Sequence, residues 1–98
     1  MEQPLVIVRI PKKLEQHWIA KHEKDGLDEW RLTSFLKSQY LLDSYERVNG
    51  DELLFKFRFQ KKGGQVMRAY LWVREKKISD GIVELIVFRG HATPLESK

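Results

Sequence analysis

The feature of this 98-residue chain that most restricts its fold is an alternation of apolar and basic residues over residues 53–77, which read LLFKFRFQKKGGQVMRAYLWVREKK. Successive side chains of a β-strand point to opposite faces of the sheet, so the pattern predicts strands with one apolar and one charged face. The double glycine in its middle, Gly63-Gly64, is typical of a hairpin turn. We therefore expect two adjacent antiparallel strands, near residues 52–60 and 65–75.

The parity of these two strands assigns each residue to a face of the sheet. The apolar side must pack under another layer, which leaves the basic and aromatic side chains on an open face. On such a face arginines can bind phosphate through paired hydrogen bonds, and aromatic rings can stack on bases. The apolar side consists of Leu53, Phe55, Phe57, Phe59, Met67, Ala69, Leu71 and Val73, and the open side of Lys56, Arg58, Arg68, Tyr70, Trp72 and Arg74.

Around this hairpin, the remaining patterns predict two helices and two further strands. Residues 5–10 are rich in β-branched residues and predict a strand. Residues 11–26 have apolar residues at helical spacing between a proline and a glycine, and a second helix is expected to begin at Asp28 as its N-cap. Residues 81–90 predict the last strand, and its alternation leaves both faces largely apolar and buried.

The order β-α-α-β-β-β predicts an α+β fold, with a mainly antiparallel four-stranded sheet and two helices packed on one face. The loops are short, so residues 1–98 are expected to form a single domain, with residues 91–98 as a loose tail. The absence of cysteine excludes disulfides and thiolate chemistry. No apolar run is long enough to cross a membrane and no signal peptide is visible, so we expect a soluble, cytoplasmic protein with no membrane partner.

The net charge of +4 is unevenly placed along the chain. Residues 1–49 carry eight Lys or Arg and eight Asp or Glu, whereas residues 50–98 carry ten and six. Residues 53–77 hold eight cations and one anion, a local charge of +7 to which Lys61 and Lys62 of the expected turn contribute. This concentration favours binding of phosphate or of an acidic protein.

Cleavage of RNA without a metal requires three chemical contributions. A group must take the proton of the 2′-hydroxyl, cations must stabilise the crowded phosphate, and an acid must protonate the departing 5′-oxygen. Arg68, with Lys56 or Arg58, can supply the charge. Histidine is the side chain that exchanges protons most readily near neutral pH, and His91 is the histidine of the basic half, so it is the candidate proton carrier.

Other chemistries find little support in the sequence. His17 and His22 are spaced i and i+5, which suits shared metal ligation poorly, and both are expected to be surface or edge residues. Gly63-Gly64 is expected to join two strands, whereas a phosphate-binding glycine loop joins a strand to a helix. We therefore expect no metal and no small-molecule cofactor.

The runs LLFKFRF, VMRAYLWV and IVELIVFRGHA, taken with the expected order of elements, resemble the RelE/ParE toxin superfamily. Its ribonucleases cut messenger RNA in the ribosomal A site, and other members of the fold poison gyrase. The resemblance implies that Lys56, Arg58 and Arg68 bind RNA phosphate, and that Arg89 or His91 is the basic group that closes the last strand. It also implies two partners, the ribosome with its messenger RNA and a cognate antitoxin protein that masks the basic face.

The leading prediction is a ribosome-dependent, metal-independent endoribonuclease of a toxin–antitoxin pair, with Arg68, His91 and Arg89 as its catalytic residues. Two alternatives stay open. Residues 4–42 also resemble a ribbon-helix-helix DNA-binding regulator, in which a short strand precedes two helices. A non-enzymatic, phage-like inhibitor or adaptor would instead use the same face to bind an acidic protein. The expected RNA- or anion-binding residues are Lys56, Arg58, Lys61, Lys62, Tyr70, Trp72 and Arg74.

Overall fold

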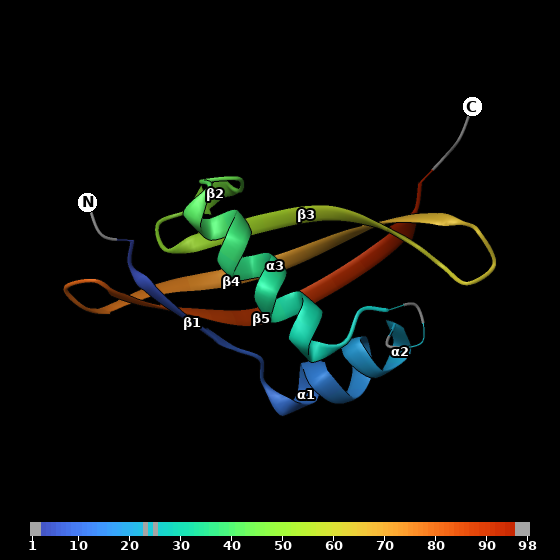
Figure 1. Ribbon diagram of the computed structural model, residues 1–98, viewed down its shortest axis with the longest axis horizontal. Helices are drawn as coiled ribbons and strands as arrows, with labels where there is room; N and C mark the ends of the chain where they lie inside the picture. Colours follow the sequence, from blue (N-terminus) through green and yellow to red (C-terminus); the bar gives the residue numbers. More distant parts are fainter. Residues whose placement is uncertain (1–2, 23, 25, 96–98) are drawn as a thin grey trace.

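A computed structural model describes residues 3–22, 24 and 26–95, with the side chains of residues 15 and 16 outside the description. Helices pack against one face of a five-stranded mixed sheet in an α+β architecture (Figure 1). The strand order is β1-β5-β4-β3-β2, in which β1 is parallel to β5 and all other neighbours are antiparallel. The strands are β1 (Leu5–Arg9), β2 (Glu46–Asn49), β3 (Glu52–Gln60), β4 (Val66–Ser79) and β5 (Ile82–Pro94).

Two helical segments cover the sheet. The longer one, α3 (Glu29–Leu41), begins at Asp28, whose side chain accepts a hydrogen bond of 2.8 Å from the backbone N–H of Arg31, which confirms the predicted N-cap. Among the described residues, no helix combines the length and the apolar character needed to cross a membrane. The earlier segment consists of α1 (Lys12–Leu14), a π-helical turn η1 (Glu15–Ile19) and α2 (Ala20–His22).

The core lies between α3 and the covered face of the sheet. Leu36 of α3 and Phe55 of β3 have no exposed surface, and full burial of such a side chain contributes about 1.5–3 kcal/mol to folding. Every strand except β2 supplies residues to this cluster. Its buried members are Val6, Ile19, Leu32, Leu36, Leu53, Phe55, Leu71, Val73, Val83, Leu85 and Val87.

The predicted faces of β3 and β4 are confirmed. On the covered side Leu53 and Leu71 are buried, and on the other side Lys56 and Arg58 are exposed. The expectation that both faces of the last strand are largely buried is wrong at Phe88, which is 39% exposed. The sheet therefore has one face covered by helices and one open face.

The number and the length of the strands differ from the prediction. The expected four-stranded sheet is wrong, because β2 adds a fifth strand at the edge beside β3. All four β2 residues are exposed, so they lack the apolar alternation that identifies a half-buried strand. β4 and β5 continue beyond their predicted ends to Ser79 and Pro94, because each is the other's partner along most of its length.

The loose tail predicted for residues 91–98 is wrong over its first part. Residues 91–94 belong to β5 and pair with the first residues of β4. Residues 96–98 lie outside the described residues. His91 is thus held by strand pairing, which fixes its position on the sheet.

At the opposite edge, β1 pairs with β5 from Leu5↔Ile82 to Arg9↔Ile86. The ribbon-helix-helix alternative for residues 4–42 expects this strand to pair across a dimer. Its pairing within the chain is instead that of a strand inside a larger sheet.

Candidate nucleic-acid interface

The open face carries three successive cross-strand rows on β3, β4 and β5 that contain most of the predicted site residues. Directly opposed residues of neighbouring strands have their Cβ atoms about 4.5–5.5 Å apart, so the side chains of each row are neighbours on this face. We call these rows together the basic-aromatic face. From the hairpin end they are Arg58–Arg68–Thr93, Lys56–Tyr70–His91 and Leu54–Trp72–Arg89.

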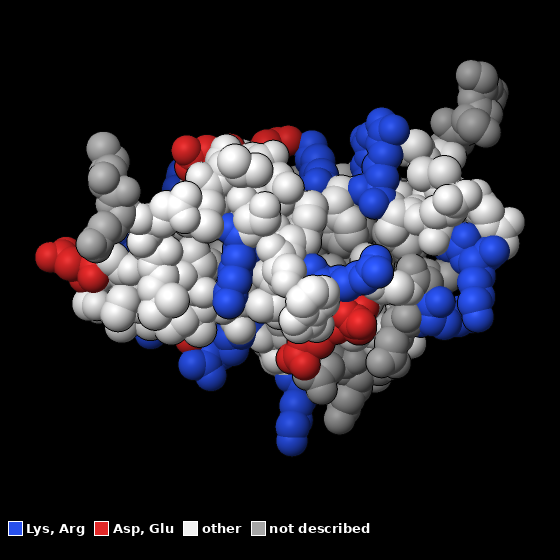
Figure 2. All heavy atoms as spheres, viewed as in Figure 1, with Lys and Arg blue, Asp and Glu red and all other residues white. Residues whose placement is uncertain are grey.

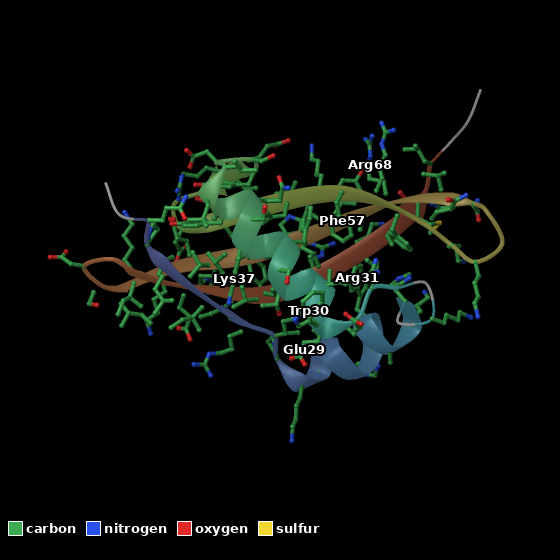
Figure 3. The ribbon with its side chains drawn as sticks, viewed as in Figure 1. Glu29, Trp30, Arg31, Lys37, Phe57 and Arg68 are labelled. Carbon is green, nitrogen blue, oxygen red and sulfur yellow. The ribbon has the colours of Figure 1, made fainter. Side chains whose placement is uncertain are left out.

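Arg58 and Arg68 face each other directly in the first row. Within the described part of the chain, neither guanidinium has a carboxylate at ion-pair distance or a hydrogen-bond partner. Like charges directly opposed on a sheet destabilise it, so the pair weakens the fold unless an anion lies between the two groups. Figure 3 shows Arg68 beyond β3 and away from the helices, whereas Phe57 lies beside α3.

The next two rows form a stack of rings. The Tyr70 ring neighbours those of Trp72, along β4, and His91, across on β5, with ring centroids 6.1 Å and 6.2 Å away and interplanar angles of 30° and 27°. The Arg89 guanidinium lies over the Trp72 ring, 4.6 Å from its centroid. A ligand that approaches Trp72 from that side therefore meets a guanidinium plane, which can also stack on a base.

Two of the predicted cations are already partnered. Lys56 Nζ lies 2.6 Å from a Glu46 carboxylate oxygen, and Glu46 belongs to β2, the strand that the sequence did not reveal. Arg74 Nε lies 3.9 Å from Asp51, and its guanidinium lies 5.1 Å from the centroid of the Phe88 ring. These two charges are less available to a ligand than those of the Arg58–Arg68 pair.

The two predicted turn lysines lie beyond the rows, at the β3–β4 hairpin. The Lys61 N–H donates to the Gln65 carbonyl at 2.8 Å, which closes the turn. Lys62 is exposed near the tip. They extend the positive end of the sheet without joining the three rows.

The sequence did not predict one polar network, because its members come from three separate elements. Glu75 of β4 accepts hydrogen bonds from the Tyr40 hydroxyl at 2.5 Å and from Arg47 Nη2 at 3.1 Å. Burial alone would raise the pKa of Glu75, but these two hydrogen bonds and the positive charges of Arg47 and Lys77 together outweigh it and hold that pKa below its usual value. Burial and the bond to Glu75 raise the pKa of Tyr40 well above the ordinary tyrosine value. The network fastens the end of α3 to β4 and β2.

The two helical histidines differ from expectation in one respect. His17 is exposed, as predicted, but His22 is buried, because its ring packs against Trp18 at 4.8 Å and Phe59 at 5.3 Å between centroids. Across the described residues, no group of three His, Asp or Glu side chains has the arrangement of a metal site.

Comparison of the chain with protein-family models, with curated proteins and with solved structures found no match. Figure 2 shows the helix-covered side, where Lys and Arg side chains are scattered among uncharged atoms and acidic ones. The ordered rows of cations and rings belong to the other side, which makes the basic-aromatic face the candidate interface.

Proposed function

We propose that the basic-aromatic face binds single-stranded RNA and that the protein is a metal-independent endoribonuclease, acting on messenger RNA at the ribosome as the toxin of a toxin–antitoxin pair. The observation that carries the proposal is the opposed pair Arg58 and Arg68, which no described carboxylate neutralises. A phosphodiester group between the two guanidiniums would turn mutual repulsion into two attractions. The neighbouring ring stack supplies a surface for the adjacent bases.

The positions of the proposed catalytic residues suit a single phosphodiester linkage. Arg68 and His91 are diagonal neighbours on adjacent strands, because Arg68 pairs with Thr93 and Tyr70 pairs with His91. Diagonal neighbours are about 7–8 Å apart, a separation that one phosphate and its ribose can span. Arg89 lies one row further along the same face and adds positive charge beside the leaving group.

In the proposed reaction, the 2′-oxygen of the ribose attacks the adjacent phosphorus. His91 takes the proton of the 2′-hydroxyl, the new oxygen–phosphorus bond forms, and the bond from phosphorus to the 5′-oxygen breaks. His91 then returns the proton to the departing 5′-oxygen, which leaves a cyclic phosphate and a free 5′-hydroxyl. Arg58 and Arg68 stabilise the additional negative charge on the phosphate in the transition state.

Binding is tested first, with a fluorescent single-stranded RNA and anisotropy measured over a range of salt concentrations. We expect Arg58→Gln/Arg68→Gln to weaken binding and to reduce the slope of log K against log salt by about 0.7, because the pair is proposed to neutralise one phosphate and each phosphate neutralised on a single strand contributes about 0.7. Lys37→Gln, an exposed lysine on α3, is the matched control and should leave the slope unchanged. An unchanged slope in the double variant would contradict phosphate binding at this pair.

Cleavage is tested by induced expression in bacteria, with primer extension across a translated message. The wild type should arrest growth and produce new ends inside codons, and Arg68→Ala and His91→Gln should lose both effects while remaining folded. Arrest with an intact message would point to a protein target and reject the nuclease. Retained cleavage in His91→Gln would remove His91 as the proton carrier.

A further inference from the structure

A cavity of about 580 Å³ lies where β5 emerges from beneath β1. β1 ends opposite Ile86, so the following part of β5 is bordered by the α1–η1 segment instead. Figure 1 shows this helical segment beside the red portion of β5. The volume is within the range of about 300–1,000 Å³ that is typical of small-molecule sites.

The lining of the cavity combines apolar surface with positive charge. Leu14, Trp18 and Phe88 supply apolar and aromatic surface. Lys13, Lys21 and Arg89 surround it, and none of the described side chains that line it is a carboxylate. A ligand that complements this cavity is therefore a planar ring system that carries an anionic group.

Local irregularities of the backbone border the cavity. The β4–β5 pairing shifts between Trp72↔Arg89 and Val73↔Val87, so Phe88 is the extra residue of a β-bulge. Such bulges redirect side chains, and π-helical turns such as η1 are common at functional sites. A Cβ at Gly90 would lie 3.0 Å from the Trp18 ring, so the glycine allows the indole to lie against the strand.

Trp18 also carries a polar atom that lacks a protein partner. Its Nε1 is buried and has no hydrogen-bond acceptor among the described residues. Buried N–H donors without a hydrogen-bond acceptor are rare in proteins, so each one needs an explanation. Because Nε1 has less than 1 Å² of accessible surface, a bound molecule can supply an acceptor only if the indole shifts.

We infer that the cavity binds one nucleotide unit, with its base against Trp18 and its phosphate beside Lys13 and Lys21. The inference rests on the proposed function, because the nucleotide would come from an RNA strand bound on the basic-aromatic face. Arg89 connects the two sites, since it belongs both to that face and to the lining of the cavity. A strand of RNA held on that face can pass one unstacked nucleotide across Arg89 into the cavity. A free mononucleotide has the same chemistry and is the alternative source.

The test uses the ¹⁵N-labelled full chain and follows the assigned indole N–H resonance of Trp18 by NMR. The titrants are adenosine monophosphate and uridine monophosphate, with ribose phosphate and adenosine as controls that each lack one half. We expect both nucleotides to shift the Trp18 resonance with sub-millimolar affinity, and each half to bind about tenfold more weakly or worse. No shift at about 10 mM of either nucleotide would overturn the inference.

Variants separate the cavity from the open face. Lys13→Glu/Lys21→Glu changes two exposed lysines and should weaken mononucleotide binding about tenfold or more, whereas Lys37→Glu should not. Equal binding by both variants would also overturn the inference. If the double variant fails to fold, the affinities of the wild type for the whole nucleotide and for each of its two halves still test the inference.

The two proposals can fail independently. Arg58→Gln/Arg68→Gln should lose RNA binding but keep mononucleotide affinity within about twofold, because neither residue lines the cavity. RNA binding without any Trp18 response would reject the cavity site alone. Mononucleotide binding without RNA binding would retain the cavity site, assign it to a free nucleotide and reject the proposed function.

Discussion

A double-mutant cycle on Arg58 and Arg68 measures whether the two guanidiniums repel each other in the free protein. Their residues are directly opposed across β3 and β4, and side chains of this length can hold their charges about 7 Å apart. At that separation in a water-like dielectric the repulsion is roughly 0.6 kcal/mol. Either single change to glutamine removes the whole repulsion, and the second change gains nothing further.

We therefore expect a coupling energy of about 0.6 kcal/mol between the two sites, which corresponds to a shift of roughly 2–5 °C in Tm for a domain of this size. The cycle subtracts the free energy of packing that each single variant loses with its arginine side chain. Urea and thermal unfolding in low salt, repeated near 1 M salt, provide the assay. Near 1 M salt the Debye length is about 3 Å, so the two charges are screened from each other and the coupling should disappear. Added inorganic phosphate should stabilise the wild type more than the double variant.

Three results would refute the reasoning. A coupling energy near zero in low salt would show that the charges avoid each other, and the pair would then be no evidence for an anion site. A coupling of the same size at high salt would show that the arginines interact through packing rather than charge. A loss of more than about 1 kcal/mol in Arg68→Gln alone would mean that this side chain has a structural role.

Two further predictions concern stability. Glu75→Gln should lower the urea midpoint at pH 7, and the difference from the wild type should shrink as the pH falls through the lowered pKa of Glu75, because stability from a depressed carboxyl pKa is lost on protonation. Parallel midpoint–pH curves for the two proteins would contradict this role of Glu75. Asp28→Ala should cost about 1 kcal/mol in unfolding free energy, and Asp28→Asn much less, since asparagine keeps the capping oxygen that accepts from the Arg31 N–H. Equal losses in both variants would argue against the cap.

The sequence by itself determined the faces of β3 and β4 and the start of α3. The two-residue period of a strand places Arg58 on the side opposite to Phe55, and Arg68 on the side opposite to Leu71. Asp28 likewise caps α3 through a bond to a residue only three positions away. These features are local, so the chain encodes them within a few residues.

Tertiary structure decided which candidate residues meet. The register between β3 and β4 set Arg58 against Arg68, and β2, an exposed strand without apolar alternation, brought Glu46 to Lys56. The pairing of β5 with β4 places His91 in a strand and in the rows of the basic-aromatic face, and not in the expected loose tail.

The cavity and the buried His22 depend even more on contacts between distant elements. The cavity joins the α1–η1 segment to a bulge in β5 some seventy positions later in the chain. His22 packs against Phe59 from another element of the fold. Such pairings follow from strand register and from the packing of separate layers, which a pattern read along one segment does not contain.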